Sequence, residues 1–195
     1  MTLILADRQH PLRPRLEDAV QQMFAAEYGA RVSNFTAHMI GRLDAEGVVE
    51  AVAGLRFESD GFFSEAYIDA PVEAVIAKYY GQSAARREIV EFSNLAATRP
   101  GAALPLLQAA IRVALAGGAR FAIFTATNRL RALLRRRGVA AIDLGPASPE
   151  RIENASAWGR YYLHDPHVLT VSADSLPEDC FAAWAPDRQA QVHHA

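Results

Sequence analysis

The sequence predicts an α/β (α+β) fold in which a central, mixed and twisted sheet carries helices on both faces. Three observations lead to this prediction. An amphipathic helical segment lies near the start of the chain, a meander of extended segments follows it, and two strand–helix units come next. No repeat occurs and no linker is long enough to separate domains, so residues 1–195 are predicted to form a single domain.

The first half of the chain is predicted to contain two helices and three strands. The helical segments have apolar residues three and four positions apart and are followed by glycine, a common helix cap. The extended segments alternate between apolar and polar residues, and D-A-E-G at 44–47 predicts a hairpin turn. The predicted helices are 15–28 and 71–81, and the predicted strands are 31–42, 48–58 and 62–68.

In the second half, apolar runs rich in β-branched and aromatic residues alternate with segments of helical periodicity. The last residues, 177–195, suggest a short packed helix and then a frayed tail. The predicted strands are 87–96, 120–127, 139–145 and 160–172, and the predicted helices are 104–116 and 128–138.

The composition limits the classes of function. A net charge of −2 gives no general attraction to nucleic acid or to anionic membranes. The N-terminal apolar run is too short for a signal peptide and no run approaches the length of a transmembrane helix, so a soluble, cytoplasmic protein is expected. Cys180 is the single cysteine, and the H-x-x-H of His164 and His167 has no third ligand, so no metal is expected. The oligomeric state stays open.

A strand, a turn and a helix start within residues 90–118 form a candidate phosphate site. The unpaired N–H groups and partial positive charge of a helix start attract anions. Small residues at 101–103 let a phosphate approach the backbone, and Arg99 adds positive charge. This pattern fits a phosphate-bearing cofactor, and it also fits an ordinary strand–helix crossover.

Carboxylates at two places are candidate general bases. Glu65, Tyr67 and Asp69 alternate along a predicted strand, which puts them on one face, where they either line a cleft or simply meet solvent. Glu91 and Ser93 lie in a strand too apolar to be an exposed edge. A buried carboxylate there needs partners or a raised pKa, so Glu91 is either an active-site group or the partner of a buried arginine.

Two further segments carry reactive or charged side chains. The aromatic segment 158–168 offers tyrosines that can protonate a leaving group and histidines that can act as bases, although Trp158 is equally explained by packing. The arginine-rich segment 128–138 suits phosphates or anionic lipid, and it also describes an ordinary solvated helix face.

Seven strings occur in order between residues 15 and 172: AEYGARVSNFTAHM, AVAGLR, FFSEAYIDAPVE, IVEFSNLAAT, FTATNRLRALLRRRGV, IDLGPA and WGRYYLHDPHV. Together they resemble the thermostable hemolysin family of bacterial proteins. Residues 173–195 carry no signature of that family. The members look like relatives of the GNAT acyltransferases, especially of acyl-homoserine lactone synthases and N-acyl amino acid synthases.

The resemblance implies a GNAT-like acyltransferase fold. It also implies direct transfer of an acyl group from a pantetheine thioester to the amine of a small molecule such as an amino acid or a polyamine. The donor is expected to be acyl-CoA or an acyl carrier protein acting as co-substrate, with no tightly bound cofactor. The residues carried over to the donor's pyrophosphate are Arg99, Gly101, Ala102 and Ala103.

The resemblance also assigns catalytic roles. A backbone N–H near Asn94 or Leu95 is expected to polarise the thioester carbonyl. Glu91 or Glu65 is expected to deprotonate the amine. The thiolate then takes a proton from one of two tyrosines, Tyr161 or Tyr162. The residues expected to contact the substrate are Tyr67, Asp69, Ser93 and Trp158.

Two alternatives belong to other functional classes. The family name and the arginine-rich segment suit a membrane-active, lytic protein, although no segment combines helical amphipathicity with a large apolar face. A non-catalytic GNAT-like binding module is the other alternative, because the glycine-rich phosphate loop usual in GNAT enzymes is degenerate here.

Overall fold

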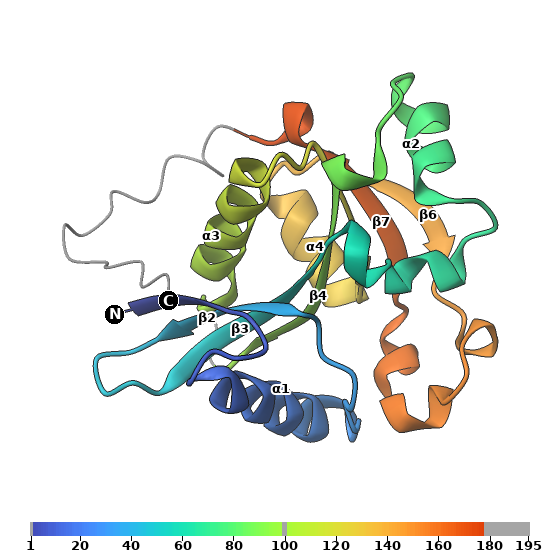
Figure 1. The fold of residues 1–195 in the computed structure, drawn as a ribbon. Helices are drawn as coiled ribbons and strands as arrows, with labels where there is room; N and C mark the ends of the chain where they lie inside the picture. Colours follow the sequence, from blue (N-terminus) through green and yellow to red (C-terminus); the bar gives the residue numbers. More distant parts are fainter. Residues whose placement is uncertain (1, 99–100, 178–195) are drawn as a thin grey trace.

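A computed structural model of the chain contains one mixed sheet of seven strands in the order β1-β2-β3-β4-β5-β7-β6 (Figure 1). The structure describes residues 2–98 and 101–177. All neighbouring strands are antiparallel except β4 and β5, which are parallel. The strands are β1 Thr2–Ala6, β2 His38–Leu43, β3 Val49–Arg56, β4 Ile89–Ala97, β5 Phe121–Ala126, β6 Ile142–Pro146 and β7 His167–Ser172.

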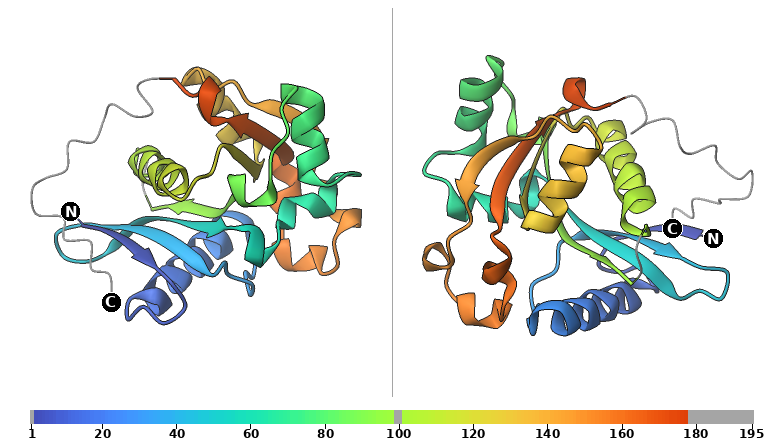
Figure 2. Two further views of the ribbon diagram at one scale, coloured as in Figure 1. Left: turned by 45° about the horizontal axis from the view of Figure 1, so that its top comes forward. Right: turned by 180° about the vertical axis from the view of Figure 1, so that it is seen from behind.

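Helices cover both faces of this sheet, as predicted (Figure 2). One face carries α1 and α2, whose apolar side chains join two adjoining clusters of buried residues, while α3 packs on the opposite face together with α4. The four helices are α1 Arg13–Tyr28, α2 Val72–Tyr80, α3 Ala103–Ala116 and α4 Asn128–Arg136.

Small residues let the helices approach the sheet closely. On α3, Leu106, Ala110 and Ala114 are buried against the middle strands. On the other face, Gly41 lies directly under the Leu16 side chain of α1, and any Cβ at this position would collide with Leu16. Close packing of this kind explains why an apolar periodicity in the sequence translates into layers.

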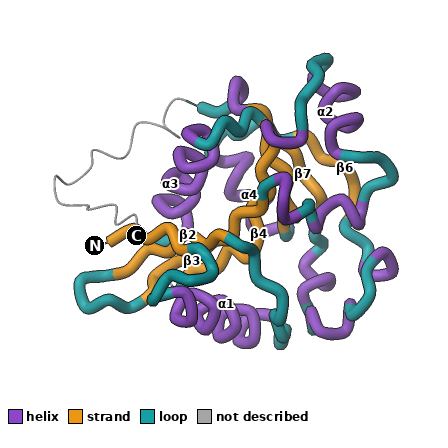
Figure 3. Tube along the Cα trace, viewed as in Figure 1, coloured by secondary structure: helices purple, strands orange, loops and turns teal. Residues whose placement is uncertain are grey.

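The structure corrects several predicted elements. The N-terminal apolar run forms the edge strand β1, which sequence analysis did not predict. The predicted strand 31–42 is regular only from His38 onward. The predicted strand 62–68 is a 3₁₀ helix, Phe63–Tyr67, within a connection of short helical turns (Figure 3). The first part of the predicted strand 160–172 is a 3₁₀ helix, Tyr161–His164. Residues 178–195, including Cys180, lie outside the described residues.

Tertiary contacts account for the 3₁₀ helix at 63–67. The backbone N–H groups of Phe63 and Ser64 donate to the buried carboxylate of Glu91, at 2.6 and 2.9 Å. These two N–H groups are therefore satisfied by a distant side chain instead of by a neighbouring strand. The period-two alternation of Glu65, Tyr67 and Asp69 consequently does not place them on one face of a strand, and that prediction is wrong.

The two central parallel strands separate soon after they meet. β4 pairs with β5 only over Ile89–Glu91, opposite Phe121–Ile123. Farther along β4, Asn94 has a φ of 51° and neither Asn94 nor Leu95 has a partner in the register with β3. This bulge accompanies the separation of β4 from β5, and the gap between the strands is where the candidate site lies.

Candidate functional site

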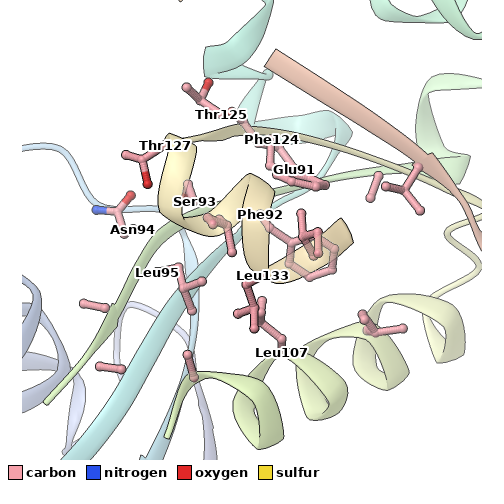
Figure 4. A pocket seen from close by; sticks show the side chains of 18 of the residues that line it. Glu91, Phe92, Ser93, Asn94, Leu95, Leu107, Phe124, Thr125, Thr127 and Leu133 are labelled. Atoms are coloured by element: carbon pink, nitrogen blue, oxygen red, sulfur yellow. The ribbon is translucent and has the colours of Figure 1, made fainter. Parts of the chain in front are cut away.

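A cavity of about 900 Å³ occupies the gap between β4 and β5. Its walls come from both strands, from α3 and α4 on one face of the sheet, and from α1 and the 3₁₀ segments on the other. Figure 4 shows β4 side chains from Glu91 to Leu95 beside Phe124, Thr125 and Thr127 of the β5 segment.

The two sides of the cavity differ in chemistry. The wall on the α3 and α4 side is mainly apolar, apart from Gln108 and a few arginines that include Arg136 and Arg137, and Figure 4 shows Leu107 and Leu133 gathered there, away from Asn94 and Thr127. Its residues include Phe92, Leu104, Leu107, Ile111, Leu130, Leu133 and Leu134. The wall on the α1 side carries most of the hydroxyl and amide groups, together with the largely buried charged groups of Arg56 and Glu91. Its residues include Asn34, Arg56, Ser64, Tyr67, Glu91, Ser93 and Tyr161.

Glu91 is the buried carboxylate of this site, with 1% of its surface exposed. It accepts hydrogen bonds from the N–H groups of Phe63 and Ser64 and, at 2.6 Å, from the Ser64 hydroxyl. Burial raises the pKa of Glu91, although these hydrogen bonds and the nearby Arg56 guanidinium act in the opposite direction. Glu91 is therefore buried, as predicted, and it also has the arginine neighbour of the alternative interpretation.

A chain of hydroxyl groups connects Glu91 with β5. The Ser64 hydroxyl donates its one proton to Glu91, so in its 3.1 Å hydrogen bond with the Thr125 hydroxyl it acts as acceptor. Thr125 itself lines the cavity. The order Thr125, Ser64, Glu91 thus joins the cavity wall to a buried carboxylate across the gap between the strands.

Aromatic rings form the end of the cavity near α1. Trp158 and Tyr161 line it and contact each other, with ring centroids 5.3 Å apart, and Tyr28 packs edge-on against Tyr161. Burial raises the pKa of Tyr161 well above its ordinary value, which keeps the phenol protonated. The hydroxyl groups of Tyr67 and Tyr162 bond to each other at 2.7 Å.

The structure brings most of the predicted site residues to one cavity. Those that line it are Tyr67, Glu91, Ser93, Asn94, Leu95, Gly101, Ala103, Trp158 and Tyr161. Glu65, Asp69, Ala102 and Tyr162 do not line it, and Arg99 lies outside the described residues. Ala102 is instead buried in the core beneath α3.

Glu65 and Asp69 hold the segment between β3 and α2 in place. The carboxylate of Glu65 bonds to Arg86, while exposed Asp69 pairs with Arg151 at 2.6 Å. Neither carboxylate lines the gap between β4 and β5, and each pairs with an arginine outside the cavity.

Three cavity residues escaped the sequence analysis: Arg56, Ser64 and Thr125. Arg56 ends a buried strand, Ser64 lies in a segment that reads as extended, and Thr125 follows an apolar run. Arginine, serine and threonine are common at such positions, so nothing in the one sequence distinguishes them. Only the pairing of segments distant in the sequence brings these three residues to the cavity.

The described residues hold no cluster of three or more His, Cys, Asp or Glu side chains suited to a metal ion. Among the helices in the described ranges, none combines the length and the apolar character needed to cross a membrane.

A family model described as "Thermostable hemolysin" matches residues 6–176. The chain belongs to the thermostable hemolysin family. A comparison with curated protein sequences gives no match for this family member. The family assignment agrees with the resemblance found in the ordered sequence strings.

Solved structures resemble this family member over nearly its whole length. The AHL synthase LasI has a TM-score of 0.63 at 12% identity, covering 96% of this chain and 97% of its own. FeeM, an N-acyl amino acid synthase from uncultured soil microbes, has a TM-score of 0.58 at 11% identity, covering 89% and 99%. BjaI, a CoA-dependent acyl-homoserine lactone synthase, has a TM-score of 0.60 at 14% identity, covering 92% and 85%.

These similarities confirm the predicted GNAT-like fold. At identities this low they establish the architecture alone.

Proposed function

We propose that this chain is a GNAT-like acyltransferase that moves an acyl group from a pantetheine thioester to the amine of a small molecule. One observation carries the proposal: the cavity between β4 and β5 has an apolar wall on one face of the sheet and a polar wall with a buried carboxylate on the other. Two substrates of different polarity can therefore meet at the gap between the strands. The structural neighbours named as acyl-homoserine lactone and N-acyl amino acid synthases support the same reading.

The donor occupies the α3 and α4 side in this proposal. The acyl chain lies along the apolar wall, where each buried methylene stabilises binding by about 0.8 kcal/mol. The start of α3, at Gly101 and Ala103, faces the donor's phosphates. The N–H of Asn94 or Leu95, at the bulge in β4, polarises the thioester carbonyl.

The acceptor amine enters from the α1 side and loses its proton before it attacks. The proton passes to the Thr125 hydroxyl, Thr125 passes its own proton to Ser64, and Ser64 passes its own to Glu91. Burial raises the pKa of Glu91, which makes this carboxylate a better proton acceptor. Glu91 thus acts as the base without leaving its buried position.

The free amine nitrogen then bonds to the thioester carbon, the carbon–sulfur bond breaks, and the nitrogen loses its second proton to solvent. Tyr161 gives its proton to the departing thiolate, because it lines the cavity whereas Tyr162 does not. Solvent afterwards removes the proton from Glu91 and restores the one on Tyr161. The overall reaction converts an ammonium and a thioester to an amide, a thiol and one proton.

The experiment measures thermal stabilisation by acetyl-, octanoyl- and palmitoyl-CoA, and then release of free thiol with pooled amino acids and amines. Thr125→Val should lower the turnover rate by about 100-fold or more, in line with loss of general-base catalysis. Glu91→Gln should do the same.

The matched controls change groups outside the cavity. Glu65→Gln removes a carboxylate that follows Ser64 in the same 3₁₀ helix but does not line the cavity, and Thr170→Val removes a buried hydroxyl that donates to Ala122 on the same sheet. Both should keep the wild-type turnover rate. Equal losses in variants and controls would refute the proposed relay.

Other outcomes separate the alternatives. No stabilisation by any thioester would exclude CoA as donor and leave an acyl carrier protein. Stabilisation without thiol release would indicate a binding module, and leakage of liposomes caused by the purified protein would indicate a lytic one.

A further inference from the structure

Arg56 places a positive charge in the cavity wall with no hydrogen bond to hold it. It is the last residue of β3, opposite Glu91 on β4, and 12% of its side chain is exposed. Its Nε is buried without a hydrogen-bond partner, and its closest approach to a described carboxylate is 3.8 Å, from Nε to Glu91 Oε2. Within residues 2–98 and 101–177, the guanidinium side chain makes no hydrogen bond.

Two further polar groups of the same cavity also lack partners among the described residues. The Ser93 hydroxyl and the Asn94 side-chain nitrogen are both buried and make no hydrogen bond there. Ser93 pairs with Gly54, two residues before Arg56, so Arg56 and Ser93 lie on the same face of the sheet. All three groups can donate hydrogen bonds, and leaving buried donors unpaired is unfavourable.

A guanidinium without a hydrogen bond in a cavity wall suits a carboxylate. The fork of N–H groups on arginine matches the two oxygens of a carboxylate, and such charge-assisted hydrogen bonds are stronger than neutral ones. Glu91 does not fill this role, because its nearest oxygen lies 3.8 Å from Arg56 Nε, beyond hydrogen-bond distance, and its carboxylate is directed to Phe63 and Ser64. The missing acceptor therefore comes from a ligand.

The position of Arg56 indicates which ligand supplies the carboxylate. Arg56 extends from the α1 face of the sheet, whereas the exposed arginines 136 and 137 of the cavity wall lie beside α4 on the opposite face. The phosphates of a donor bound on the α3 and α4 side have arginines 136 and 137 in the same wall of the cavity. The anion at Arg56 belongs to the acceptor.

We infer that Arg56, with Ser93 and Asn94, binds the carboxylate of the acceptor, which makes the acceptor an amino acid instead of a polyamine. This inference rests on the proposed acyltransferase function. Arg56 offers a cation to the ligand's carboxylate, while the relay through Thr125 and Ser64 to Glu91 takes the proton of its ammonium. A polyamine would bring only positive charges to the arginine, which is unfavourable in a site largely shielded from water.

The test compares L-amino acids with the amines that lack only the carboxylate: L-leucine with isopentylamine, L-phenylalanine with phenethylamine, and L-ornithine with putrescine. Binding is measured by thermal shift and calorimetry, which need no turnover. Thiol release with octanoyl-CoA is measured in parallel. In the wild type, at least one amino acid should bind about 10- to 100-fold more tightly than its matched amine, the range expected for charge-assisted hydrogen bonds.

Arg56→Gln should abolish this preference by weakening amino-acid binding about 10- to 100-fold while binding of the amine stays the same. Arg56→Lys, which keeps the charge without the fork, should retain part of it. Arg42→Gln is the matched control, because Arg42 is also a largely buried strand arginine paired with a glutamate, but it does not line the cavity. This control should keep the preference.

Three results would overturn the inference: equal binding of amino acids and amines by the wild type, no binding of any tested amino acid, or loss of CoA binding in Arg56→Gln, which would assign Arg56 to the donor. The failure of the proposed function looks different. In that case neither amines nor amino acids release thiol from any donor. The preference of Arg56 for amino acids over amines is still tested by the binding measurements, which do not depend on thiol release.

Discussion

The hydrogen bonds between Glu65 and Arg86 allow a quantitative prediction for the pH dependence of stability. Both carboxylate oxygens of Glu65 accept from Arg86, at 2.9 and 2.5 Å, and one also accepts from the N–H of Val72 at 3.0 Å. The two side chains are 22% and 27% exposed. Since these bonds join the segment carrying Ser64 to the start of α2, they support the candidate site from outside the cavity.

Glu65→Gln removes the charge but keeps one acceptor oxygen. Hydrogen bonds to charged groups contribute about 1.5–3 kcal/mol, and partial exposure reduces this value, so we expect a loss of about 1–2 kcal/mol in the free energy of unfolding. For a domain of this size, that loss lowers the melting temperature by about 2–8 °C at neutral pH.

The effect should depend on pH in a defined direction. Hydrogen bonding by Arg86 lowers the pKa of Glu65 below its ordinary value of 4.5, with burial opposing and the Val72 N–H assisting. A lowered folded-state pKa gives a stabilisation that is complete above the unfolded-state pKa and is lost as pH falls through the folded-state pKa. Glutamine does not titrate, so the difference in stability between the wild type and Glu65→Gln should shrink at acidic pH.

The assay is thermal unfolding of both proteins, followed by circular dichroism between about pH 7 and pH 3. The difference in melting temperature should be constant from neutral pH down to about pH 5 and shrink below about pH 4.5. Asp69→Asn, which removes the more exposed ion pair with Arg151, serves as the comparison and should cost less. A Glu65→Gln difference that stays constant or grows down to pH 3 would refute the reasoning.

Three further predictions concern packing and the cavity. Gly54→Ala should destabilise the fold by about 1–3 kcal/mol in urea unfolding, because the added Cβ would lie 2.7–2.8 Å from neighbouring side-chain atoms; an unchanged midpoint would contradict this. Leu107→Trp should fill the apolar wall and weaken binding of palmitoyl-CoA more than that of acetyl-CoA in calorimetry, and equal effects would count against an acyl site there. Tyr162→Phe should lower the free energy of unfolding by about 1 kcal/mol through the lost bond to Tyr67 while thiol release continues, whereas Tyr161→Phe should slow it; the reverse order would exchange their roles.

The local pattern of apolar and polar residues was sufficient to predict most helices and strands and the burial of one residue of the site, Glu91. The helices near 15–28, 71–81, 104–116 and 128–138 follow from apolar periodicity and their caps, and the structure confirms them. The burial of Glu91 was also predictable, because the residues around it are too apolar for an exposed strand.

The same pattern gave a wrong prediction where a distant side chain accepts the hydrogen bonds of the backbone N–H groups. Residues 62–68 alternate like a strand, yet the Phe63 and Ser64 N–H groups bond to Glu91, and the segment turns instead of extending. Edge strand β1 is a short apolar run of five residues without an alternating pattern, so its strand character depends on its pairing with β2.

The sequence by itself determined the layered α/β architecture and the family, and it predicted a buried carboxylate at Glu91. The tertiary structure decided which polar groups share the cavity. It brought Arg56, Ser64 and Thr125 to Glu91 and left Glu65 outside. The physical reason is that periodicity fixes which face of an element is buried, whereas strand register and the divergence of β4 from β5 fix which distant residues meet.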